Sequence, residues 1–407
     1  MNAVVAEFAE HWPLYTAIPF IAALIGYVTK RVAIEMMFRP LEFIGIRPVF
    51  GWQGVVPKHG GRMAAIATDL LTANLIDLGE VFGRIQPDRL VREIEQPMLR
   101  AIDDLAREVM ARHHPRLWES LPPMAQDLVV KQLQAGSPKL VRELLDDIRA
   151  NLDGVLDVKH MTVERLTRDR ALLVRLIRET SRPEMAFIAR CGIYFGFILG
   201  IAQAVVWALT KNPWVLPVFG GCIGFFTDWL AIKLIFLPRR PVKLGPFTLH
   251  GKFQRRKAEV ARQYGEIIAR EVLTVPNLLD ELLNGPRADK LAALVRRVVA
   301  RAVDEQAGLI RPLVSAALGG ERLREMTETA AAGALTQLPH LLRHAEPYLV
   351  EAMDLANMVE RRMLALTPEE YENLLRPAFR QEEWKLIAVG GVIGFGVGEL
   401  QVLLMLH

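Results

Sequence analysis

One apolar stretch occurs twice in this chain of 407 residues, once near the N-terminus and once just past the middle. Residues 19–40 read PFIAALIGYVTKRVAIEMMFRP, and residues 217–238 read PVFGGCIGFFTDWLAIKLIFLP, in the same register at an offset of 198. The identical positions are Pro19/Pro217, Ile25/Ile223, Gly26/Gly224, Thr29/Thr227, Ala33/Ala231, Ile34/Ile232, Phe38/Phe236 and Pro40/Pro238. Such a match indicates an internal duplication.

The duplication extends along the whole chain. A second pair of apolar segments aligns at the same offset, with Gly192, Gly196 and Gly200 falling on Gly390, Gly394 and Gly398. Between the apolar segments the offset slips to 197, where Leu152 meets Leu349. We therefore predict two copies of one unit, residues 1–198 and 199–407.

Four apolar segments are expected to cross a membrane as α-helices: residues 14–38, 186–209, 214–237 and 386–406. Each has roughly the 20 residues that a helix needs to cross the hydrocarbon layer. The apolar fraction of the chain is 51%, yet 24% of its residues are charged, which favours membrane segments joined to polar regions. The alternative is that these segments are buried core helices of a soluble protein.

Basic residues predict the orientation of these segments. Lys and Arg cluster after the first and third segments and before the second and fourth, whereas the linker between the second and third holds only Lys211. Basic flanks tend to stay cytoplasmic, so both termini are expected outside and the two large connecting regions inside. Because each copy has an even number of spans, the second copy is expected to insert parallel to the first.

The connecting regions, residues 58–183 and 252–383, are expected to form two helical cytoplasmic domains. Glycines and prolines, such as those at 136–138, are expected to divide each region into several helices. Apolar residues recur at helical spacing on one face in each region. The first stripe includes Leu140, Val141, Leu144, Leu145 and Ile148, and the second includes Leu291, Leu294, Val295, Val298 and Val299. The stripes are predicted to be core, or alternatively an exposed face that binds lipid. The fold class is therefore all-α.

A short irregular piece, predicted to be a hairpin or loop, follows the first and third spans. In the second copy, residues 239–257 contain basic residues and no acidic one. These side chains would attract anionic lipid headgroups, or would serve only as a signal for topology. They are Arg239, Arg240, Lys243, Lys252, Arg255, Arg256 and Lys257.

These stretches give the chain a resemblance to a bacterial membrane family, domain of unknown function 445. The resemblance rests on GYVTKRVAIEMMFRP with GVVPK downstream, on GFFTDWLAIKLIFLP with GKFQRRKAEVA downstream, and on GGVIGFGVGELQ in the last span. The first copy has Lys30 and Arg31 where the second has Asp228 and Trp229. The resemblance implies an integral membrane protein with large helical regions, and it implies no catalytic residues. The expected localisation is the bacterial inner membrane.

The glycines of the second and fourth spans form a repeated G-x-x-x-G pattern. Such a pattern makes a flat strip on one helix face, against which another backbone packs closely. We expect spans two and four to pack on each other, or each to pack on span one or three. The residues concerned are Gly192, Gly196, Gly200, Gly390, Gly394 and Gly398.

Charges of opposite sign occupy equivalent positions of the two copies. Lys30 corresponds to Asp228, and Glu35 corresponds to Lys233. Ionisable groups within spans usually face the bundle interior and pair with one another, so both pairs are predicted to form about a two-fold axis. The alternative is that these charges lie at the cytoplasmic interface or form local pairs, such as Arg31 with Glu35.

The sequence contains no recognisable catalytic set, and no metal, cofactor or nucleic-acid partner is expected. His340 and His344 have the spacing of two metal ligands, but no third ligand is evident. We expect a non-enzymatic multi-pass protein that binds, organises or transfers lipid or other amphipathic material. The alternative is a transporter or channel with a polar site between the copies, and a channel would require a homo-oligomer.

Overall fold

The structure, a computed structural model, describes residues 12–46, 50–210, 212–236, 242–244, 247–249, 251–307, 320–373 and 383–406. The chain is mostly helical and divides into two compact units. We name them the apolar unit, which comprises Met1–Leu70, Arg165–Tyr264 and Glu360–His407, and the helical unit, which comprises Leu71–Glu164 and Gly265–Val359.

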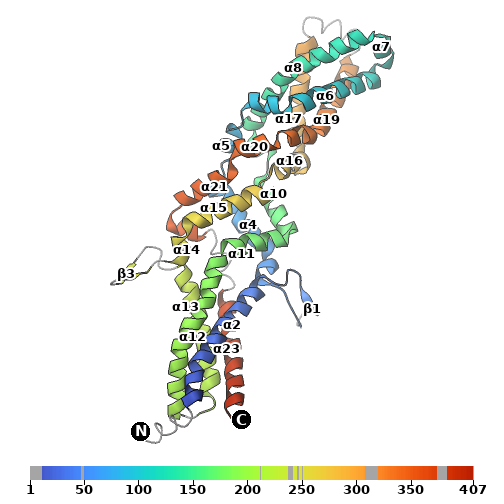
Figure 1. The fold of residues 1–407 in the computed structure, drawn as a ribbon. Helices are drawn as coiled ribbons and strands as arrows, with labels where there is room; N and C mark the ends of the chain where they lie inside the picture. Colours follow the sequence, from blue (N-terminus) through green and yellow to red (C-terminus); the bar gives the residue numbers. More distant parts are fainter. Residues whose placement is uncertain are drawn as a thin grey trace. The chain divides into compact units, whose positions relative to one another are not determined.

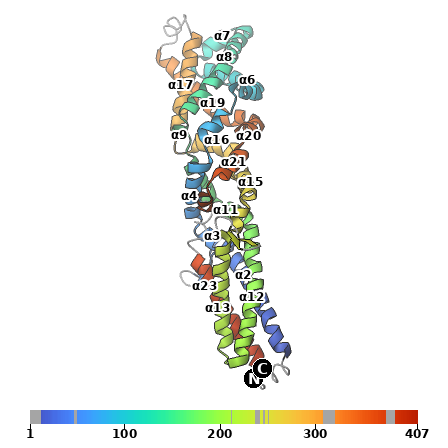
Figure 2. The ribbon, with the colours of Figure 1, turned by 90° about the vertical axis from the view of Figure 1, so that its left-hand side faces the viewer.

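Four long helices pack side by side in the apolar unit: α2 (Trp12–Phe38), α12 (Arg182–Thr210), α13 (Val215–Phe236) and α23 (Glu383–Leu406) (Figures 1 and 2). The most extensive contacts join α2 to α12 and α13 to α23, with further contacts between α12 and α13. Both close pairs are antiparallel. Gly200 lies against Pro19 while Gly192 lies against Gly26, and the equivalent glycines of α23 lie against α13 in the same order.

Two helices of the described chain are long and apolar enough to cross a membrane. They are the segments Thr16–Phe38 and Arg182–Thr210. Shorter apolar stretches, Val215–Ala231 and Ile387–Leu403, lie in α13 and α23. The helix outer surfaces are strongly apolar, with Phe20, Leu209 and Val392 each more than half exposed. A helix that is apolar on the outside as well as the inside is typical of a membrane span.

The irregular pieces after the first and third apolar segments, expected to be a hairpin or a loop, are β-hairpins. Strand β1 (Ile44–Ile46) pairs with β2 (Phe50–Trp52), and β3 (Val242–Leu244) pairs with β4 (Phe247–Leu249), both antiparallel. The apolar unit also contains α3 (Val55–Lys58), α4 (Gly60–Leu70), α11 (Arg170–Thr180), α14 (Lys252–Arg255) and most of α15 (Lys257–Ile267).

The helical unit is built around four long helices. In it α6 (Pro87–His113) packs on α8 (Pro123–Ala150) and α19 (Gly320–His344), and α17 (Ala288–Ala307) packs on the same two. Its other elements are α5 (Leu78–Gly83), α7 (Pro115–Ser120), α9 (Leu152–Val155), α16 (Val275–Asn284), α20 (Glu346–Met353), and π-helical turns at Leu71–Leu75 and Ile268–Val272. Helices α10 (Val158–Arg168) and α21 (Leu355–Ala365) begin in this unit.

The structure departs from the two separate helical domains expected at residues 58–183 and 252–383. Helices α6 and α8 come from the first region, α17 and α19 come from the second, and they share one body. An amphipathic stripe must be covered by something, and here helices from each connecting region cover the stripes of the other region. The division of the sequence at residue 198 is therefore not a division into compact units.

Elements recur along the chain at nearly constant spacing. The π-helical turns begin at Leu71 and Ile268, and α10 and α21 begin at Val158 and Leu355, which are both separations of 197 residues. The hairpins begin at Ile44 and Val242, 198 residues apart. Unusual local structures thus recur at the offset at which the sequence matches itself.

Helix α8 continues through Gly136 and Pro138, where the sequence predicted a break. Proline removes one backbone donor and leaves the carbonyl of Gln134 without its helical partner. The hydroxyl of Ser137, which is buried, donates to that carbonyl at 2.7 Å. A side chain thus replaces the missing backbone bond and the helix is not interrupted.

Candidate functional site: an apolar cavity in the helical unit

The helical unit contains an apolar cavity of about 250 Å³ that is partly open to the outside. Helices α5, α6, α8, α16, α17, α19 and α20 contribute to its wall. Among the described residues that line the cavity, Gln337 alone has a polar side chain. Its lining includes Phe82, Ile94, Met98, Ile102, Leu105, Leu140, Val141, Leu144, Leu145, Ile148, Leu278, Leu282, Val295, Val298, Val299, Ala334, Gln337, Leu338, Leu341 and Leu349.

The amphipathic stripes seen in the sequence form this wall. Val141, Leu144 and Ile148 of α8 follow helical spacing, and all three reach the cavity. The second stripe lies on α17, and its Val295 and Val298 also line the cavity. Residues predicted to be core are therefore partly core and partly the lining of an open space.

This lining fixes the chemistry of a suitable ligand. A smaller engineered apolar cavity of about 150 Å³ stays free of water and binds benzene, because water finds no polar partners there. A hydrocarbon group that enters the cavity would bury apolar surface at roughly 25 cal/mol per Å². The lining therefore suits an apolar group, beside which the amide of Gln337 offers a polar contact.

A buried ion pair joins equivalent positions of the copies in the apolar unit. The ammonium Nζ of Lys30 on α2 lies 2.5 Å from Oδ1 of Asp228 on α13, and it donates to Thr227 Oγ1 at 2.7 Å. Lys30 is 2% exposed and Asp228 is 7% exposed. The structure thus brings together one of the two pairs expected from the sequence, and it places the pair inside the helix bundle.

The other expected pair, Glu35 with Lys233, does not form. Glu35 instead accepts from Arg178 at 2.8 Å and lies 3.2 Å from Arg39, one helical turn away. Lys233 is exposed, and its Nζ lies 4.8 Å from the centre of the Trp229 ring. Glu35 and Lys233 lie nearer the ends of α2 and α13 than Lys30 and Asp228 do, and each contacts other residues instead of the other.

A second contact between equivalent positions lies elsewhere in the same bundle. The amide Nε2 of Gln203 on α12 lies 3.3 Å from Oε1 of Gln401 on α23, and both side chains are buried. Gln203 and Gln401 are 198 residues apart, as are Lys30 and Asp228. Two contacts in this bundle therefore join residues that are 198 positions apart.

The six glycines lie at the close helix contacts within each copy. A Cβ added at Gly196 would lie 2.7 Å from the carbonyl oxygen of Ala22, and one added at Gly394 would collide with the carbonyl oxygen of Gly220. Of the expected arrangements, the structure has α12 on α2 and α23 on α13. Gly192 and Gly200 similarly lie against α2, and Gly390 and Gly398 lie against α13.

Comparison with known proteins finds relatives over nearly the full length. The chain is similar to the UPF0754 membrane proteins. One from Thermosynechococcus vestitus is 23% identical over 96% of each chain, and one from Synechococcus sp. strain JA-3-3Ab is 23% identical over 97% of this chain and 99% of its own. One from Shouchella clausii is 32% identical over 27% of this chain and 30% of its own.

No family model matches the chain, and no solved structure matches it. The resemblance to domain of unknown function 445 therefore stays an expectation. The names of the UPF0754 relatives say that they are membrane proteins and do not say what they bind. Their description as membrane proteins agrees with the apolar outer surfaces of α2 and α12.

Two of the basic residues after the third apolar segment are held by contacts within the fold. Arg256 lies 2.6 Å from the buried Glu184 and 2.8 Å from Glu259. Lys257 donates to the carbonyls of Leu364 and Leu366. Hydrogen bonding to Glu259 is the largest influence on Arg256 and raises the pKa of its guanidinium, whereas burial lowers the pKa of the Lys257 ammonium. These contacts compete with the predicted contact to lipid headgroups.

For the other basic residues of this set, contact with lipid headgroups stays a prediction. Arg255 is exposed, and Lys252 begins α14 beside it. Lys243 lies in β3. Arg239 and Arg240 lie outside the described residues.

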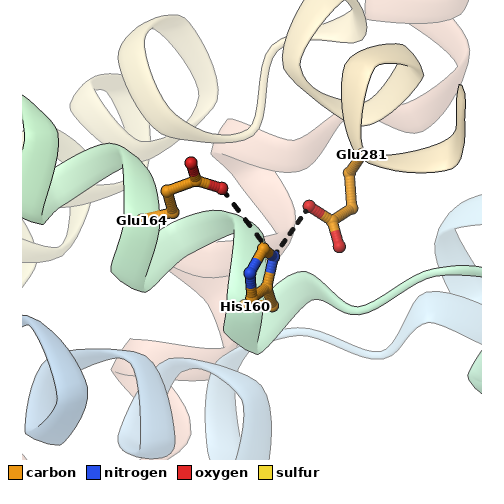
Figure 3. A group of neighbouring side chains, drawn as sticks. All are labelled: His160, Glu164 and Glu281. Carbon is orange, nitrogen blue, oxygen red and sulfur yellow. Dashed lines mark hydrogen bonds and ion pairs between the residues drawn. The ribbon is translucent and has the colours of Figure 1, made fainter. Parts of the chain in front are cut away.

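A group of potential metal ligands, not predicted from the sequence, lies where α10 meets α16. His160 and Glu164 of α10 and Glu281 of α16 converge, with their ligand atoms all within 4.8 Å of one another (Figure 3). His160 and Glu164 have the i, i+4 spacing of two ligands on one helix, which was the available signal. The pair considered in the sequence, His340 and His344, has rings in an edge-to-face arrangement and an Nδ1 contact to a backbone carbonyl.

Proposed function

We propose that this chain is a non-enzymatic, multi-pass membrane protein whose helical unit binds the acyl chain of a lipid or of similar amphipathic material. The observation that carries the proposal is the apolar cavity between α6, α8, α16, α17 and α19. The similarity to proteins named as membrane proteins supports the setting. Binding of this kind would serve to hold, organise or pass on lipid at the membrane surface.

The membrane part of the proposal comprises four spanning helices in two parallel copies. Helices α13 and α23 have shorter apolar stretches than α2 and α12, but they pack in the same bundle and occupy equivalent positions. The contacts of Lys30 with Asp228 and of Gln203 with Gln401 support a two-fold axis between the copies. An axis along the membrane normal is the symmetry that two parallel copies require.

The orientation follows from the basic flanks of the apolar helices. Lys and Arg cluster at the C-terminal ends of α2 and α13 and at the N-terminal end of α12. These are the helix ends that continue into the two large connecting regions. We therefore place the hairpins and the helical unit in the bacterial cytoplasm and both termini outside the inner membrane. In a variant whose native Cys191 and Cys222 are replaced by serine, single cysteines introduced at the exposed positions Glu119 and Trp214 should react with an impermeant thiol reagent in intact cells only at Trp214.

The cavity can be tested by filling it. Ala334 of α19 lines the cavity, so Ala334→Phe is expected to occupy space that an acyl chain would take. We expect the purified variant, in detergent, to bind a fluorescent fatty acid at least about tenfold more weakly, a loss of about 1.4 kcal/mol of binding free energy. Titration of the fatty acid against the protein measures this difference.

A matched control lies two residues away on the same helix. Ala332 is exposed, so Ala332→Phe adds the same side chain outside the cavity, and its affinity should equal that of the unmodified protein. Equal binding by both variants would show that the fatty acid is held elsewhere and would remove the cavity from the proposal. Circular dichroism would verify that both variants are folded.

The second candidate function is a transporter or channel with a polar site between the copies. It is favoured by one observation, the burial of Lys30 and Asp228 inside the helix bundle of the apolar unit. Charges inside a membrane bundle often mark ion or substrate pathways. Ion or solute flux through reconstituted vesicles that is lost in Asp228→Asn, while the variant remains folded, would favour this function over lipid binding.

A further inference from the structure

We propose that His160, Glu164 and Glu281 form a binding site for a divalent transition-metal ion such as Zn²⁺. The site lies in the helical unit, where one turn of α10 faces α16. It is separate from the lipid-binding proposal, and either can fail without the other. Three features support the site: the spacing of the ligand atoms, an unsatisfied buried carboxylate oxygen and the types of the ligands.

The distances suit a metal ion as well as a hydrogen bond. Nδ1 of His160 lies 3.2 Å from Oε2 of Glu281 and 3.9 Å from Oε2 of Glu164. Two ligands bound to Zn²⁺ at about 2.0–2.1 Å with tetrahedral geometry are separated by about 3.3 Å. His160 and Glu281 already have this separation. Glu164, whose side chain is 47% exposed, requires only a small rotation toward them.

Glu281 is a buried carboxylate with one oxygen that has no hydrogen-bond partner. Its side chain is only 5% exposed, and it points from α16 toward His160 (Figure 3). Its Oε2 contacts His160, but its Oε1 is buried without a hydrogen-bond partner. Burial accordingly raises the pKa of this carboxyl group. An unsatisfied buried polar atom costs free energy, and a cation bound to the carboxylate would offset that cost.

The other copy of the duplication has a different set of residues at the equivalent positions. At the offset of 197, His160 corresponds to Asn357, Glu164 to Arg361, and Glu281 to Arg84. Two arginines and an asparagine cannot bind a cation together. The ligand set is therefore particular to one place in the chain and is not a requirement of the repeated fold.

The ligand types select the class of ion. One imidazole nitrogen with two carboxylates suits Zn²⁺ and its neighbours in the first transition row, whereas Mg²⁺ and Ca²⁺ prefer oxygen ligands alone. Three protein ligands leave a fourth position for water. Because the ion would join α10 to α16, it would also fix α16, whose Leu278 and Leu282 line the cavity.

Co²⁺ provides a direct probe, because its visible absorption bands strengthen when it occupies a four-coordinate site. We expect the full-length protein in detergent to bind a single Co²⁺ ion per chain with such bands, and Zn²⁺ to displace it while Mg²⁺ does not. Glu164→Gln and Glu281→Gln, which keep the side-chain shapes, should each lower the affinity by more than about 100-fold, since losing a ligand costs more than losing its second-shell partner.

The paired histidines of α19 supply the matched control. The double variant His340→Ala with His344→Ala removes a surface pair outside the proposed site, and it should leave the cobalt spectrum unchanged. Absence of the spectrum in the unmodified protein, or its persistence in Glu164→Gln and Glu281→Gln, would overturn the proposal. So would its loss in the histidine control. Because Glu164 is exposed, Glu164→Gln should remain folded and keep the test decisive.

Discussion

Asp228→Asn is expected to destabilise the protein by about 3–5 kcal/mol, because it leaves the ammonium of Lys30 buried without its counterion. The change preserves the size of the side chain, so the loss reports on charge and not on packing. Lys30 retains a contact with Thr227 Oγ1, which does not neutralise it. Unfolding of the detergent-solubilised protein, followed by circular dichroism against temperature, measures the difference.

Glu35→Gln is the control for this prediction. Glu35 pairs with Arg178 and Arg39, but its side chain is 44% exposed, and exposed ion pairs contribute only about 0–1 kcal/mol. The variant should therefore unfold close to the unmodified protein. A loss as large as that of Asp228→Asn would mean that burial does not explain the difference.

The charge swap Lys30→Asp with Asp228→Lys should recover much of the lost stability. The two positions have similar surroundings: the stem of Lys30 lies against Gly192, and the carboxylate of Asp228 lies against Gly390, the equivalent glycine. A lysine at position 228 would therefore lie against Gly390 much as Lys30 lies against Gly192, and an aspartate at position 30 would lie against Gly192 much as Asp228 lies against Gly390. If the swapped protein were as unstable as the single variants, the two positions would not be related by the proposed axis.

Gly196→Leu combined with Gly394→Leu is expected to abolish the assembly of the four apolar helices. At both positions a Cβ would already meet the backbone of the facing helix, and leucine adds three further carbons. Backbone cannot move aside as a flexible side chain does, so the cost exceeds the roughly 1–3 kcal/mol of ordinary overpacking. We expect the double variant to elute as aggregate in size-exclusion chromatography.

Helix α23 contains the control for this change. A Cβ added at Gly396 meets nothing within 4 Å, and the residue is exposed. Gly396→Leu should therefore elute like the unmodified protein. Similar elution of the Gly196→Leu and Gly394→Leu double variant would show that these helices do not pack as closely as the structure has them.

The sequence predicts much of the local structure and some of the long-range contacts. The match of the sequence to itself at an offset of 198 led us to expect the pairing of Lys30 with Asp228, which the structure contains. The glycine spacing identified which faces pack closely, but not which helices they pack on. The glycine spacing could not identify the partner helix, since all four helices carry small residues.

Other features depend on contacts that a single sequence does not specify. The joining of both copies in one helical unit could not be inferred from amphipathic stripes, which indicate that a face is covered but not what covers it. The partner of Glu35 is Arg178, far along the chain and on a different helix. The contact of His160 on α10 with Glu281 on α16 likewise joins residues far apart in the sequence.

The central claim is that an acyl chain occupies the cavity of the helical unit, and photocrosslinking tests it most directly. A fatty acid with a photoreactive group along its chain would be supplied to cells that produce the protein, and the labelled residues would be located by mass spectrometry after illumination. We predict labels on cavity residues such as Ile102, Leu144 and Leu338, and weaker labelling there in Ala334→Phe. Labels confined to α2, α12, α13 and α23 would contradict the account, because they would report contact with the bilayer alone.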